Sequence, residues 1–165
     1  AALMGVTLGP VYITVIGQCM GSGNQEQAKY YFEKLNKLAI VLSIVWNLIV
    51  LALTPLFMHF YQLSSETLHL IFYLVVIHNV FNAIVYPISG PLSNGLRAAG
   101  DVKFTMIVSI ASTLLARFVF SIIFAIYLNM GVIGIAFAMC LDWTIRAAIF
   151  YCRYRSLKWL EFKVI

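Results

Sequence analysis

Five apolar segments, each about as long as a lipid bilayer's hydrocarbon core requires, dominate this chain of 165 residues. They cover residues 1–20, 38–60, 68–92, 104–129 and 130–152. A helix rises about 1.5 Å per residue, so about 20 apolar residues cross about 30 Å of hydrocarbon. Because a helix satisfies its own backbone hydrogen bonds in lipid, the pattern predicts an all-α membrane protein, a polytopic bundle of five transmembrane helices.

The composition agrees with a membrane protein and excludes most water-soluble classes. Hydrophobic residues make up 62% of the chain and charged residues 10%, against about 45–50% and about 25% in soluble domains. The three cysteines show no spacing typical of a metal site. No catalytic motif is present, so we expect no enzyme activity, no metal and no nucleic-acid partner.

A glycine-containing turn at residues 21–23 ends the first segment, because glycine accepts the left-handed conformation that closes a helix. Asn24 can then cap the next helix. We predict an interfacial helix over residues 25–37 that runs into the second span, with a stabilising pair between Glu33 and Lys37. Before the fourth span, Gly100 should end one helix and Asp101 should cap the next.

The Lys and Arg residues outside the spans occur only in alternate loops. Residues 61–67 and the turn at residues 129–131 carry none. The others follow the first span, precede the fourth span or lie in the tail at residues 153–165: Lys29, Lys34, Lys37, Arg97, Lys103, Arg153, Arg155, Lys158 and Lys163. Positively charged loops favour the cytoplasmic side. We therefore predict a multi-pass protein of the cell membrane with a cytoplasmic C-terminus, and we expect further helices upstream.

Three Asp or Arg residues, charged at neutral pH, fall inside predicted spans, where each costs roughly 2.5–3.5 kcal/mol on insertion scales. Arg117 and Asp142 should lie at similar depth, because their two spans are antiparallel and joined by a short turn. Asp142 and Arg146 are four residues apart on one helix and can also meet. We predict an intramembrane polar network, which is either a structural clamp that neutralises itself or a protonatable, cation-linked site in a water-filled cavity.

Polar side chains on one face of the third span form a stripe, spaced three, four and three residues apart: Asn79, Asn82, Tyr86 and Ser89. Three residues that bend or break helices form a predicted hinge: Pro87, Gly90 and Pro91. Such a stripe beside a kink is typical of a substrate or cation pathway in transporters. The alternative is interhelical hydrogen bonding, worth about 0.6 kcal/mol per pair.

Two short motifs resemble segments of multidrug and toxic compound extrusion (MATE) transporters. IGQCMGSGN at residues 16–24 is similar to their GQxxGAG segment, and LRAAGD at residues 96–101 is similar to their LRGAGD segment. The residues from Asp142 to Trp159 resemble the close of their second half. Ala98 stands where the family usually has glycine, and Thr105 stands where a proline is common.

The resemblance implies the last five helices of a twelve-helix, two-lobed transporter, that is, an incomplete C-terminal lobe whose partners are the lipid bilayer and the missing N-terminal lobe. It implies export of amphipathic or cationic drugs and xenobiotics by alternating access. The only cofactor expected is a coupling ion, Na⁺ or H⁺. Some family members bind a cation at an acidic residue in the tenth helix, and residues 68–92 contain none. Asn79, Asn82 or Tyr86 would then replace it, or coupling would reside in the missing lobe.

Two other functions stay open. A lipid-linked oligosaccharide flippase with a related two-lobed fold would need a more cationic cavity, for which Arg117 is a single candidate. A non-transporting membrane scaffold would need neither a kinked polar helix nor charges in the middle of a span.

Overall fold

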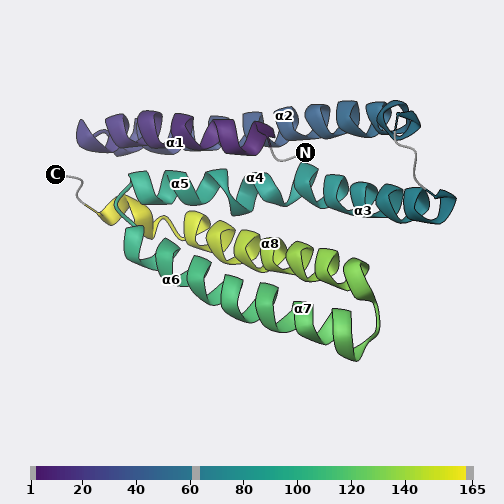
Figure 1. Cartoon of the computed structure of the whole chain (residues 1–165). Helices are drawn as coiled ribbons and strands as arrows, with labels where there is room; N and C mark the ends of the chain where they lie inside the picture. The colour runs from purple at the N-terminus through teal and green to yellow at the C-terminus, as the bar shows by residue number, and fades with distance from the viewer. Residues whose placement is uncertain (1–2, 61–63, 163–165) are drawn as a thin grey trace.

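The computed structural model describes residues 3–60 and 64–162, and within these ranges every regular element is a helix (Figure 1). The α-helices run in chain order: α1 (Leu3–Gly21), α2 (Gln25–His59), α3 (Ser65–Ile84), α4 (Tyr86–Ser89), α5 (Pro91–Ala98), α6 (Val102–Ser112), α7 (Phe120–Ile122) and α8 (Gly131–Arg155). In the described part of the chain, four stretches are long and apolar enough to cross a membrane: Gln25–His59, Ser65–Ile84, Val102–Tyr127 and Gly131–Arg155. The predicted all-α membrane fold is confirmed, and α1 adds a shorter apolar helix.

The helices lie lengthwise beside one another, so the bundle has two ends (Figure 1). The start of α2, the junction of α5 with α6, and the C-terminal end of α8 lie together at one of them. The opposite end holds the end of α2, the start of α3 and the turn before α8. The loops that carry Lys and Arg therefore lie together, and we call their side of the bundle the basic end.

The first turn forms as the sequence predicts. Gly23 has a φ of 73°, and the side chain of Asn24 accepts a hydrogen bond from the Gln27 backbone at 3.0 Å. Helix α2 then continues for 35 residues without a break, so the predicted interfacial segment and the second span are one helix. The Lys37 ammonium lies 2.8 Å from the Glu33 carboxylate, so the predicted pair forms.

The third apolar segment is divided where the sequence places its helix breakers. Helix α3 ends at Ile84, α4 occupies four residues, and α5 starts at Pro91. Proline lacks a backbone N–H and clashes with the preceding turn, so each proline here falls in the first turn of a helix instead of its interior. Whether this interruption moves as a hinge stays a prediction.

An aromatic core fixes the basic end. The Phe32 ring lies 4.9 Å from the rings of both Tyr154 and Trp159. A Cβ added to Gly95 would come within 2.5 Å of Phe32, so only glycine lets α5 approach so closely. Trp159 is fully buried and belongs to a 3₁₀ turn, η3 (Lys158–Glu161), that folds back against the helices instead of extending as a tail.

Asp101 corrects one prediction. It occupies the capping position before α6, but its side chain makes no capping hydrogen bond. Its carboxylate is buried and accepts a hydrogen bond from Arg153 Nε at 2.6 Å. The guanidinium at the end of α8 is itself charged and donates to both carboxylate oxygens, which a single backbone N–H at the cap cannot do.

The predicted fourth span is not a regular α-helix. After Ser112 it continues as a π-helical segment, η1 (Thr113–Val119), then as α7, then as a second π-helical segment, η2 (Ile123–Tyr127). Helix α8 packs closely against this irregular backbone. A Cβ added to Gly134 would lie 2.7 Å from the Phe124 carbonyl carbon and 2.9 Å from the Ala125 nitrogen.

Candidate functional site

A cavity of about 990 Å³ lies between α2, α3 and α8. Its lining comes from residues 46–58 of α2, residues 68–79 of α3 and residues 132–139 of α8. All three stretches belong to the half of the bundle away from the basic end (Figure 1). The walls are mostly aliphatic, and four of the lining residues carry a polar group: Trp46, Thr54, His78 and Asn79.

Next to this cavity, α2 and α3 bury a row of polar side chains. Asn47 Nδ2 donates to Asn82 Oδ1 at 3.3 Å and to the Ser43 carbonyl at 2.8 Å. Asn79 Nδ2 donates to the Val75 carbonyl at 2.8 Å. Five buried atoms in this region have no hydrogen-bond partner among the residues that the structure describes: Ser43 Oγ, Trp46 Nε1, Asn47 Oδ1, Asn79 Oδ1 and Asn82 Nδ2.

Such unpaired atoms are unusual, because each costs about 1–3 kcal/mol when it is buried without a partner. Two of them, Trp46 Nε1 and Asn79 Oδ1, belong to residues that line the cavity. One is a donor and the other is an acceptor. Trp46 and Asn79 therefore place one unpaired donor and one unpaired acceptor, both buried, in the wall of the cavity.

The four residues of the predicted polar stripe do not all line the cavity. Asn79 lines the cavity, and Asn82 contacts Asn47 one turn farther along α3. Tyr86 packs edge-on against Trp143 of α8, with ring centres 5.2 Å apart. Ser89 is buried and lies outside the cavity lining. The assignment of the stripe to a substrate or cation pathway stays a prediction.

The sequence analysis missed the partners of this stripe on α2. Ser43, Trp46 and Asn47 contribute three of the five unpaired atoms. A signal was present, since Asn47 stands near the middle of an apolar span, with Ser43 one turn before it. Only the packing of α2 against α3 shows that Asn47 faces Asn82.

The structure brings Arg117, Asp142 and Arg146 together. Asp142 is fully buried, and both of its carboxylate oxygens accept hydrogen bonds from Arg146, with Nε–Oδ1 at 3.0 Å. Arg117 Nε lies 3.5 Å from Oδ2. Ser112, which the sequence analysis did not single out, donates to Oδ1 at 2.5 Å. A helical register estimated from residue counts was sufficient to predict the ion pairs.

This cluster does not neutralise itself, because two guanidinium groups share one carboxylate. Arg146 holds the carboxylate with two hydrogen bonds, and its side chain is 18% exposed. The Arg117 side chain is 40% exposed, and its Nε has no hydrogen-bond partner. Arg117 therefore carries the excess positive charge, and it does so from the π-helical segment η1. Among the residues described, no group of His, Cys, Asp and Glu side chains could hold a metal ion.

These features define an integral, multi-pass helical membrane protein with a mostly apolar cavity and a buried charge cluster. Comparison with protein-family models matches residues 2–123 to the MatE family. The match covers most of the chain, so the chain belongs to this family of membrane transporters, and the predicted resemblance is confirmed. No solved structure matches the chain. Family membership assigns the protein a role in membrane transport.

Proposed function

We propose that the chain is the C-terminal part of a secondary active exporter in the cell membrane, with its C-terminus in the cytoplasm. In this proposal it works with a second lobe and exports amphipathic or cationic compounds in exchange for Na⁺ or H⁺. The two lobes alternate between inward-open and outward-open states. The ion and the substrate shift this equilibrium only if each binds one state better than the other.

The observation that carries the proposal is an apolar cavity bordered by buried polar atoms without partners. Binding pockets for small molecules typically have volumes of about 300–1,000 Å³ and mostly apolar walls with a few polar groups. The cavity between α2, α3 and α8 has about 990 Å³. Its aliphatic walls suit the apolar part of an amphipathic substrate, and Asn79 contributes a buried, unpaired carbonyl oxygen to the wall, which a rotation of its side chain would offer to an amine or ammonium group.

The test compares two substitutions on α3 in the complete transporter. Asn79→Leu keeps the branched shape of the side chain but removes its polar atoms, so we expect efflux of a cationic dye to fall at least tenfold. Stability should change little, because the lost amide makes one backbone hydrogen bond and leaves its oxygen unpaired. Val80→Leu, at a 48% exposed position next in sequence, is the matched control and should retain efflux.

If the Asn79→Leu variant retains full dye efflux, the cavity is not part of the transport pathway. If the unaltered protein gives no dye resistance but restores export of a lipid-linked glycan in deficient cells, the flippase function replaces the proposed one. If the protein binds neither dyes nor cations after purification, the scaffold function gains support.

A further inference from the structure

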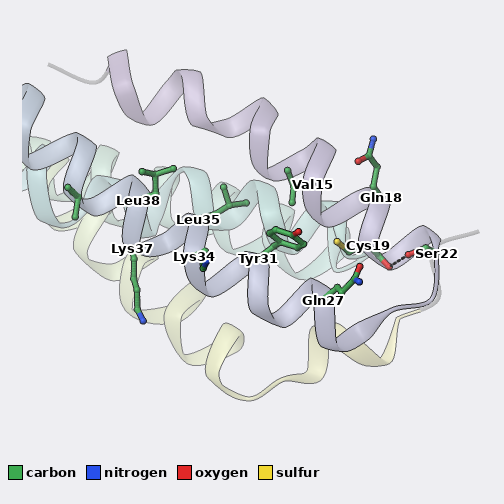
Figure 2. A pocket seen from close by; sticks show the side chains of 11 residues that line it. Val15, Gln18, Cys19, Ser22, Gln27, Tyr31, Lys34, Leu35, Lys37 and Leu38 are labelled. Atoms are coloured by element: carbon green, nitrogen blue, oxygen red, sulfur yellow. Dashed lines mark hydrogen bonds between the residues drawn. The ribbon is translucent and has the colours of Figure 1, made fainter.

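A second cavity, of about 940 Å³, lies at the basic end between α1 and the first turns of α2 (Figure 2). Figure 2 shows Ser22 and Gln27 beside the turn that joins the two helices, with Leu38 farther along α2. We call this feature the α1–α2 groove. It belongs to neither the substrate cavity nor the charge cluster, and it uses none of their residues.

The groove changes character along its length. Gln18, Gln27 and Ser22 line the end near the turn, and Tyr31 and Lys34 follow. Toward the middle of the bundle most of the lining is aliphatic, with Val15, Leu35, Leu38 and Val41, and Lys37 lies among them. A molecule that fits the whole groove has a polar head near the turn and an apolar portion that follows the helices into the hydrocarbon.

The polar part of the groove favours an anion. Two lysines line the groove and no carboxylate does. Lys37 extends away from α1 in Figure 2 and is paired with Glu33. Lys34 has no carboxylate partner among the residues described, and its ammonium lies 4.7 Å from the centre of the Tyr30 ring. The groove therefore offers one uncompensated positive charge together with side-chain amide and hydroxyl donors.

Another protein helix would suit this groove poorly. It would have to remove water from the Lys34 ammonium and from the amides of Gln18 and Gln27, and burying a charge without a partner is costly. A phosphate group instead supplies both a negative charge and hydrogen-bond acceptors. Because the groove lies where α2 enters the apolar part of the bundle, its head end falls at the level of lipid headgroups.

We propose that the α1–α2 groove binds one anionic phospholipid from the leaflet at the basic end. Its phosphate is held by Lys34, Gln27 and Gln18, and one acyl chain lies along Val15 and Leu38. This proposal requires only that the chain spans a bilayer, so it stands or falls separately from the proposed substrate cavity. It also does not depend on which side of the membrane the basic end faces.

The test counts lipids bound to the complete transporter by native mass spectrometry in neutral detergent. Phosphatidylglycerol and phosphatidylcholine with identical acyl chains are compared. We expect a preference of at least fivefold for phosphatidylglycerol and about a fivefold loss of that preference in the Lys34→Gln variant, which matches the typical contribution of one lysine at an anionic surface. Leu38→Trp, at a position 47% exposed, should fill the apolar part and weaken binding of both lipids.

Lys29→Gln is the matched control, because it removes the same charge from the same helix at a position outside the groove lining. It should retain the preference. Equal losses in the Lys29 and Lys34 variants would overturn the proposal, since the effect would then be general surface attraction. Full displacement of the lipid by glycerol phosphate would also overturn it, because an isolated anion would then suffice. Equal retention of both lipids would show that no headgroup site exists.

Discussion

At the scale of single residues, the Asp142 carboxylate is the centre of the buried charge cluster. It accepts hydrogen bonds from Ser112 and Arg146 and lies 3.5 Å from Arg117. Removing one partner from a buried ion pair costs about 3–5 kcal/mol, because the remaining charge has no compensation. In this cluster two guanidinium groups would be left without their counter-charge.

We therefore expect Asp142→Ala to lower the free energy of unfolding by about 3–5 kcal/mol, measured by denaturant titration of the purified protein in detergent. Arg117→Leu should cost much less, since its side chain is 40% exposed and its Nε makes no hydrogen bond. The double variant Asp142→Ala with Arg146→Leu should recover part of the loss. Equal costs for the Asp142 and Arg117 variants would contradict this ranking.

The same residue separates the two interpretations of the cluster. In the complete transporter, Asp142→Asn keeps the shape of the side chain but removes its charge. A cation-linked site predicts that this variant loses the dependence of efflux on pH or Na⁺. A structural clamp predicts an unchanged dependence, with lower stability only, and that result would place ion coupling elsewhere in the protein.

At the scale of helices, individual glycines allow two helices to pack closely. Gly134 lies against the backbone of η2, where a Cβ would meet the Phe124 carbonyl carbon at 2.7 Å. Backbone cannot move aside as a flexible side chain can, so Gly134→Ala should separate α8 from η2. We expect a loss of about 1–3 kcal/mol in the free energy of unfolding, the usual cost of overpacking.

Gly17 provides the matched control. It also lies inside a helix, but a Cβ there would meet nothing within 4 Å. Gly17→Ala should therefore stabilise the protein by up to about 1 kcal/mol through helix propensity. The two alanine variants should shift the unfolding midpoint in opposite directions. A shift of the same sign in both would show that packing against η2 does not decide the outcome.

The sequence predicts the helices better than their internal geometry, for a physical reason. Hydropathy and length locate an apolar helix, and prolines locate the break between α3 and α5. Neither signal carries the hydrogen-bond register, so the π-helical segments around Arg117 could not be predicted. The pairing of Asp101 with Arg153 and the burial of Trp159 depend on contacts between distant parts of the chain, which local patterns do not contain.

At the scale of the whole molecule, the two ends of the bundle differ in how tightly they are held. The basic end is closed by the aromatic core around Phe32 and by the hydrogen bond from Gln25 to the Leu160 carbonyl at 2.9 Å. The opposite half contains the cavity between α2, α3 and α8. We therefore expect the bundle to open more easily at the end away from its basic loops, because the buried aromatic core lies at the basic end.

The orientation of the basic end in the membrane decides on which side of the membrane the cavity opens. Positively charged loops favour the cytoplasm, so we expect a cysteine at Ser156 to resist a membrane-impermeant maleimide added outside intact cells. A cysteine at Asn129, in the turn at the opposite end, should react. The background is Cys152→Ser, which removes the exposed native thiol, since Cys19 and Cys140 are buried. Permeabilised cells provide the control, because both engineered cysteines should then react. The reverse labelling pattern in intact cells would mean that the basic end faces the outside and the cavity faces the cytoplasm. That result would contradict the proposed cytoplasmic C-terminus, although the fold would be the same.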